Sequence, residues 1–280
     1  MHPVKMKYPL FFFALMLCAC AAPVVQTDTP HVAAAYISPQ EHYFEAVRRG
    51  DITMVMRLVE EGLMNIGHKD VYGWTGLMYA VQHGHEGMVD YFILRQADIN
   101  ATDANGLTPL MIAAKERHPE IVGLLLEAGA KAEVRDTYGF TALMWAIYDK
   151  SYDSAQLLLA QKNTLDIKNK FGQTALHLAV DYRVEDIAVE LIRSGASVNI
   201  TDLDGNTPLH LAARSSPDRV IRMLIKKGAS PYLKNNEGKT ALDIAREAHQ
   251  QGNVECLKKS KPKKKEPVNP LSKGKRPRTN

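Results

Sequence analysis

Two short motifs in the 280-residue chain contain residue types that could bind a metal or a phosphate. His83 and His85 precede Glu86, but the chain lacks the His-Glu-x-x-His spacing that places two histidines on one helix face toward zinc. Residues 238–240, Gly-Lys-Thr, resemble the end of a phosphate-binding loop, yet Leu233 stands where that loop begins with glycine. No Gly-x-Ser-x-Gly nucleophile motif is present. We therefore predict no catalytic residue, no metal ligand, no cofactor and no enzymatic activity.

The N-terminal residues have the layout of an export signal. Lys5 and Lys7 precede an apolar run at residues 10–17, and small residues follow it. The run is too short for a membrane span, which needs about 20 residues. Either Met1 or Met6 is a suitable start.

Residues 17–20, Leu-Cys-Ala-Cys, resemble the lipobox of bacterial lipoproteins. The resemblance implies cleavage before Cys20 and lipid attachment to it, although Cys18 departs from the usual Ala, Ser or Thr. An ordinary signal peptide cut near Ala22 and an uncleaved anchor are the alternatives. Apart from these two cysteines the chain has only Cys256, so no disulfide framework is predicted.

A pattern of the form Thr-x-Leu-x-x-Ala recurs six times at a spacing of 33 residues. Its threonines are Thr75, Thr108, Thr141, Thr174, Thr207 and Thr240. A glycine stands two residues before each threonine, and an aspartate or asparagine stands three before each glycine. Aspartate and asparagine bind their own backbone in turns, and glycine accepts a positive φ. Each threonine can then cap a helix, and paired apolar residues mark a second helix in each unit.

The period and the signature resemble those of ankyrin repeats. The resemblance implies an all-α repeat solenoid, with a helix-turn-helix and a β-hairpin finger in each unit and apolar faces buried between neighbours. The signature histidine is replaced by Met78, Met111 and Met144, so softer packing is expected in the first half.

These patterns divide the chain into four parts. We predict a lipoprotein-type signal peptide at 1–19, a flexible tether at 20–39, an ankyrin repeat domain at 40–258 and a basic disordered tail at 259–280. The repeat domain has about seven units. They include a degenerate first unit in residues 41–67 and a last unit in residues 235–257 with a shortened, more polar second helix.

The resemblance also indicates where a partner binds. Partners of ankyrin repeats usually lie along the concave side, against the fingers and first helices. The matching positions here hold many aromatic side chains, with carboxylates beside them. The predicted partner-binding residues are Val71, Tyr72, Trp74, Leu107, Tyr138, Phe140, Tyr148, Asp149, Phe171, Asp181, Tyr182 and Asp204. Exposed aromatic clusters are typical of binding hot spots; the alternative is that they pack on neighbouring fingers and only stiffen the stack.

The tail differs in charge from the rest of the chain. Residues 258–280 contain ten Lys or Arg and one acid, which leaves 25 basic against 30 acidic residues elsewhere. Such a run is expected to be disordered and to attract anionic envelope polymers or lipid head groups. Residues 261–265 also resemble a nuclear localisation signal, which competes with the export signal.

The combined interpretation is a protein-binding scaffold that is lipid-anchored in the periplasm of a bacterial envelope. Some exported ankyrin proteins protect or inhibit envelope enzymes. By that resemblance we expect an immunity-type inhibitor that occludes a periplasmic enzyme such as a peptidoglycan hydrolase. The alternatives are a secreted, host-directed effector whose tail targets a nucleus or nucleic acid, and an enzyme with an unrecognised site. The export signal disfavours a nucleic acid partner.

Overall fold

The computed structural model describes residues 38–259. The predicted signal peptide, Cys20, most of the tether and nearly all of the basic tail lie outside the described residues. The part of the chain that is described contains fourteen α-helices and a short 3-10 helix, η2 (Lys162–Thr164). The all-helical repeat architecture predicted from the 33-residue period is confirmed.

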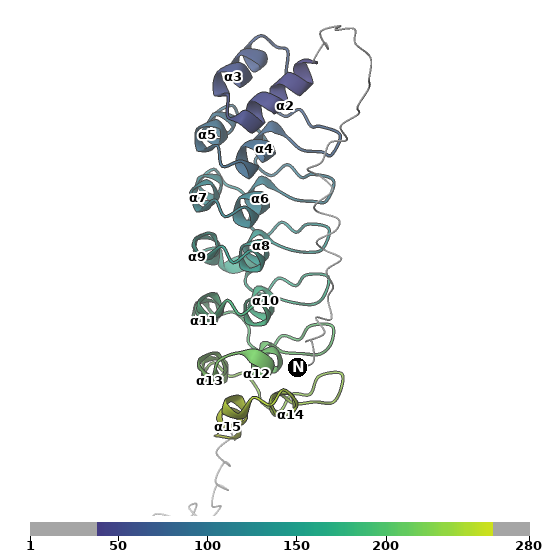
Figure 1. Ribbon diagram of the computed structural model, residues 1–280, viewed down its shortest axis with the longest axis vertical. Helices are drawn as coiled ribbons and strands as arrows, with labels where there is room; N and C mark the ends of the chain where they lie inside the picture. Colours follow the sequence, from purple (N-terminus) through teal and green to yellow (C-terminus); the bar gives the residue numbers. More distant parts are fainter. Residues whose placement is uncertain (1–37, 260–280) are drawn as a thin grey trace, which may run out of the picture. The chain divides into compact units, whose positions relative to one another are not determined.

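The helices form consecutive antiparallel pairs (Figure 1). The pairs are α2 (Pro39–Arg49) and α3 (Ile52–Glu60), α4 (Gly76–Gln82) and α5 (Glu86–Leu94), α6 (Pro109–Lys115) and α7 (Pro119–Glu127), α8 (Ala142–Tyr148) and α9 (Tyr152–Leu159), α10 (Ala175–Asp181) and α11 (Glu185–Ser194), α12 (Pro208–Ser215) and α13 (Asp218–Lys226), and α14 (Ala241–Glu247) and α15 (Gln251–Lys259). In Figure 1 the first helices stand in one column and the second helices in another, and the fingers extend from the first helices away from the second. The expected shortening of the last helix is wrong, because α15 has nine residues, as α5 and α7 do.

Each signature threonine caps its helix. The Thr75 hydroxyl accepts a hydrogen bond from the Met78 N–H, and Thr108 and Thr141 do the same one and two units later. The caps of α10, α12 and α14 are reciprocal, because the third helical residue also accepts from the N–H of the threonine. A cap of this kind stabilises a helix by about 1 kcal/mol.

The first helices are largely buried in the core. Six of the seven residues of α8 are buried, among them Trp145, and the same holds for α4 and α6. A seven-residue helix is unstable alone, so each one depends on cover from the units before and after it.

In the second half, histidines join neighbouring units. His177 Nδ1 accepts from the Thr174 N–H (3.1 Å), so its Nε2 carries the proton and donates to the Asn206 carbonyl of the next unit (3.1 Å). His210 Nε2 repeats this contact with the Lys239 carbonyl oxygen (3.2 Å) and also lies 2.9 Å from the Leu233 carbonyl oxygen. Burial lowers the pKa of His177 to about 4, because the charged ring would lose its solvation.

In the first half, aromatic donors bind the aspartates of the fingers. The Tyr79 hydroxyl donates to Asp70 (2.6 Å), and Trp145 Nε1 donates to Asp136 (3.0 Å). Trp74 Nε1 donates to Asp103 of the next finger (3.2 Å). Directed hydrogen bonds are therefore present in the first half beside the softer packing expected there.

The turn histidines also have structural roles. His85 Nε2 lies 2.9 Å from the Arg48 carbonyl oxygen of the preceding unit, and His118 Nε2 lies 3.4 Å from that of Gln82. Gly84 makes room for the His118 ring, because a Cβ there would lie 2.8 Å from it. The histidine that resembled a metal ligand in the sequence therefore holds two units together.

Gly76 is required by a close approach between α4 and its neighbours. A Cβ at this position would lie 2.8 Å from Phe92 Cζ and 2.9 Å from Tyr43 Cζ, and both rings are fully buried. Tyr43 comes from α2, so the contact joins the first helix pair to the second.

Gly76→Ala is expected to lower the free energy of unfolding by about 1–3 kcal/mol, because the added methyl overpacks two buried rings. Gly123→Ala is the matched control: it lies inside α7 with no atom within 4 Å of its added Cβ. It should stabilise by about 0.5–1 kcal/mol through helix propensity. Urea unfolding of both variants checks the pair, and equal effects would contradict the packing assigned to Gly76.

His177→Met is expected to flatten the pH dependence of stability. The folded-state pKa lies below the unfolded value near 6.5, so stability is fully present above pH 6.5 and is lost as the pH falls toward 4. The shift corresponds to at most about 3 kcal/mol. Methionine occupies the equivalent buried position at Met144. Urea unfolding at pH 7 and pH 4.5 should show a smaller loss in the variant than in the wild type, and equal losses would contradict the assignment.

Candidate functional site

Each finger is a tight turn closed by one side-chain oxygen. Asp70 Oδ1 accepts from the N–H groups of Tyr72 (2.9 Å) and Trp74 (2.8 Å). The same two bonds recur in the other five fingers, at Asp103, Asp136, Asn169, Asp202 and Asn235. The turn predicted from the Asp or Asn and Gly spacing is confirmed.

Backbone hydrogen bonds join each finger to the next. The donors and acceptors are Ala104 N–H to Tyr72 O, Thr137 to Asn105, Lys170 to Tyr138, Leu203 to Phe171 and Asn236 to Asp204, at 2.9–3.1 Å. The approach is so close that a Cβ on Gly172 would lie 2.8 Å from the Leu203 nitrogen. The six fingers are therefore one connected ribbon.

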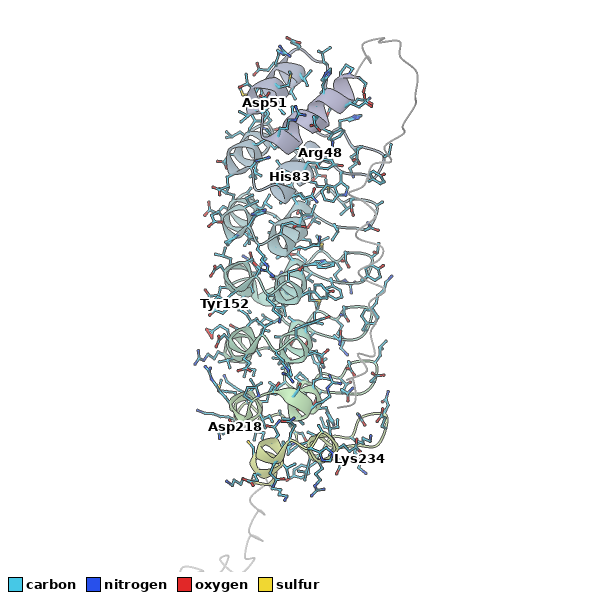
Figure 2. All side chains as sticks on the ribbon, in the orientation of Figure 1. Arg48, Asp51, His83, Tyr152, Asp218 and Lys234 are labelled. Carbon is cyan, nitrogen blue, oxygen red and sulfur yellow. The ribbon has the colours of Figure 1, made fainter. Side chains whose placement is uncertain are left out.

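We call the surface formed by the finger tips and the C-terminal ends of the first helices the finger face. Figure 2 shows side chains extending from the fingers along the described stack. Three predicted residues are exposed on it: Val71 (92% exposed), Tyr72 (59%) and Tyr138 (37%). Leu203, 66% exposed at the finger position equivalent to Val71, belongs with them. It is outside the predicted set.

Seven further predicted residues are half-buried on this face: Trp74, Tyr148, Asp149, Phe171, Asp181, Tyr182 and Asp204. The remaining two are buried, Leu107 at 6% and Phe140 at 5% exposure, so the expectation that they are exposed is wrong. The Phe140 ring centroid lies 5.2 Å from that of Trp145 in α8. The Phe140 side chain thus packs on the first helix of its own unit, rather than on a neighbouring finger.

A row of aromatic rings leads from the core to the finger face. Phe140 contacts the buried Trp145, whose centroid is 5.7 Å from that of Tyr148. Tyr148 at the end of α8 then meets Tyr182 at the end of α10, edge to face, at 5.1 Å. Burial raises the pKa of both tyrosines. Tyr148 and Tyr182, at the finger-face end of the row, are therefore held in place through contact with the buried Trp145 ring.

The carboxylates on this face are not equivalent. Asp181 forms an ion pair with Arg214 of the next unit (2.6 Å), and Glu116 forms one with Lys115 (2.9 Å). Oδ2 of Asp149 is buried without a hydrogen-bond partner. Burial raises the pKa of Asp149 to about 6, because desolvation penalises its charged form.

Other features of residues 38–259 do not indicate a reactive centre. No group of three or more His, Cys, Asp or Glu residues in this range could hold a metal ion. A cavity of about 490 Å³ lies between α13 and α15, lined by Arg222 and Cys256 among others, but burial raises the pKa of the Cys256 thiol. No helix in the same range is long and apolar enough to cross a membrane.

Comparison with known proteins gives concordant matches. The family model described as ankyrin repeats (3 copies) matches residues 15–103, 87–168, 161–235 and 186–266. The crystal structure of the human ASB11 ankyrin repeat domain is similar, with a TM-score of 0.67, 28% identity, and coverage of 78% of this chain and 96% of that one. The ankyrin repeat domain of Bcl-3, a member of the IkappaB family, has a TM-score of 0.67, 27% identity and coverage of 78% and 97%.

A curated relative matches over a short segment. Ankyrin repeat domain-containing protein 29 of Danio rerio is 39% identical over 57 residues, which are 20% of this chain. The match spans about a fifth (19%) of that relative's length.

Proposed function

The chain belongs to the ankyrin repeat family, and we propose that it is a non-catalytic scaffold that binds a partner protein through its finger face. The fold is typical of such scaffolds. The observation that carries the proposal is the exposure of Val71, Tyr72, Tyr138 and Leu203 along one ribbon of fingers. A series of exposed apolar side chains on a rigid surface is typical of a protein interface.

The rigidity of the finger ribbon supports the same proposal. Adjacent fingers share backbone hydrogen bonds, and the aromatic row is anchored on buried Trp145. Fewer side chains and loops then need ordering when a partner binds, so less conformational entropy opposes association.

We further propose that the protein is a lipoprotein of a bacterial envelope, anchored through Cys20 and directed to the periplasm. Support comes from the export layout of residues 5–22 and the lipobox-like residues 17–20. In that setting the partner is an envelope enzyme, such as a peptidoglycan hydrolase, whose active cleft the finger face covers as an immunity-type inhibitor. The basic residues at 258–280 would bind anionic envelope polymers.

Removing the exposed finger-tip side chains should weaken partner binding. We expect Tyr72→Ser, Tyr138→Ser and Leu203→Ser together to weaken the affinity at least 30-fold, about 2 kcal/mol or more, because exposed anchors carry most interface energy. The partner is first captured from envelope extract on the wild type, and affinities are then measured with the purified pair.

The matched control is Leu94→Ser with Leu157→Ser, which removes exposed apolar side chains from the second helices α5 and α9. It should bind as the wild type does. Both variants should unfold at the wild-type urea concentration. A folded finger-tip variant with unchanged affinity would exclude the finger face as the binding surface.

The lipid anchor has a separate test. In cells fed an alkyne fatty acid, the wild type should be labelled and found in membranes, whereas Cys20→Ser should be unlabelled. Cys18→Ala is the control and should remain labelled, because the family commonly has alanine there. Unlabelled wild type in the culture medium would instead favour the secreted, host-directed alternative.

A further inference from the structure

One carboxylate on the finger face has a buried oxygen without a hydrogen-bond partner. Among residues 38–259, three buried side-chain atoms have no hydrogen-bond partner: Tyr43 Oη, Tyr91 Oη and Asp149 Oδ2. The two hydroxyls belong to side chains buried in the core. Asp149 is half-buried at the C-terminal end of α8, so solvent reaches the residue although one of its oxygens is covered. An unsatisfied carboxylate is the most costly of the three to bury.

Neighbouring charges act on Asp149 without forming an ion pair with it. Lys115 and Arg117 lie near enough to affect its charge, but Lys115 is 2.9 Å from Glu116, whose own charge opposes theirs. At the equivalent position in the next repeat, 33 residues after Asp149, the chain has Tyr182 rather than a positively charged side chain. Asp181, by comparison, pairs with Arg214.

Two tyrosine rings lie beside this carboxylate. Tyr148 is the residue before Asp149, and its ring meets Tyr182 edge to face at 5.1 Å. Tyr182 occupies the position equivalent to Asp149 in the next unit, so the two residues lie at the C-terminal ends of the neighbouring helices α8 and α10. Aromatic faces attract cations, and the same stack already shows this in Arg48, whose guanidinium lies 4.4 Å from the Tyr79 ring centroid.

We propose that Asp149, Tyr148 and Tyr182 form a receptor for one arginine side chain of the partner protein. The inference rests on the proposed function and adds the chemistry of one contact. A guanidinium can donate an N–H group to the Asp149 oxygen that is not covered, while its flat face stacks on a tyrosine ring. An ammonium group matches only the charge, so arginine is preferred over lysine.

The receptor has a predictable response to pH. Burial raises the pKa of Asp149 to about 6; Glu116 adds to the shift, and Lys115 and Arg117 oppose it. Tyr148, Tyr182 and Asp181 are the titratable groups on the adjoining helix ends. At pH 7.5 the carboxylate is charged and binds a cation. At pH 5 roughly a tenth of it remains charged, so affinity should fall about tenfold.

The test uses the purified chain and a small probe, N-acetyl-arginine-N-methylamide, followed by the NMR signals of the Tyr148 and Tyr182 rings. The citrulline analogue, which has nearly the same shape without the charge, is the control ligand. We expect saturable binding of the arginine probe at pH 7.5, at least tenfold weaker binding of the citrulline probe, and about tenfold weaker arginine binding at pH 5.

Asp149→Asn should weaken binding of the arginine probe at least tenfold without loss of stability, because it removes an uncompensated buried charge. Asp153→Asn, an exposed carboxylate on α9, should bind as the wild type does. Equal binding by Asp149→Asn, equal binding of citrulline, or no saturable binding at these rings would each overturn the receptor. None of these results affects the finger-tip experiment, so the two proposals fail separately.

Discussion

The structure depends on the burial of each short first helix between its two neighbours. Helices such as α4, α6 and α8 have seven residues, six of them buried, and could not persist in an isolated unit. Stability is therefore a property of contacts between successive units. The contacts are dense enough that Gly76 has no room for a methyl group. This coupling also fixes the position of every finger, since each finger leads directly into a capped first helix.

Because the fingers are rigid, the apolar side chains at their tips stay exposed to solvent and available to a partner. Tyr72 and Leu203 are held on turns whose aspartates each accept two backbone N–H groups, and the turns are bonded to one another. A mobile loop could fold such side chains back onto the surface, whereas this ribbon keeps them in solvent. Directed apolar exposure of this kind is costly without a partner, which is why the finger tips carry the functional proposal.

The sequence predicted most fully what depends on neighbouring residues. Threonine caps and aspartate turns need only contacts two to four residues apart, so a repeated spacing reveals them. Burial of Phe140 could not be predicted in this way, because it depends on packing against Trp145 in three dimensions. The bond from Trp74 to Asp103 crosses 29 residues and replaces a histidine contact with a different donor. The unsatisfied oxygen of Asp149 and the charges around it depend on contacts between successive units.

Burial has opposite consequences for His177 and Asp149, although both pKa shifts have desolvation as their largest cause. His177 is satisfied when neutral, because the Thr174 N–H and the Asn206 carbonyl bind its two nitrogens. Its neutrality at physiological pH therefore costs nothing. Asp149 is charged at the same pH and lacks a partner, so it destabilises the free protein as the pH rises through about 6. A guanidinium from a partner would remove that penalty on binding. The hydrogen-bonding groups of a structural residue such as His177 find partners within the fold. The carboxylate of Asp149 does not, and we propose that a group of the partner protein binds it.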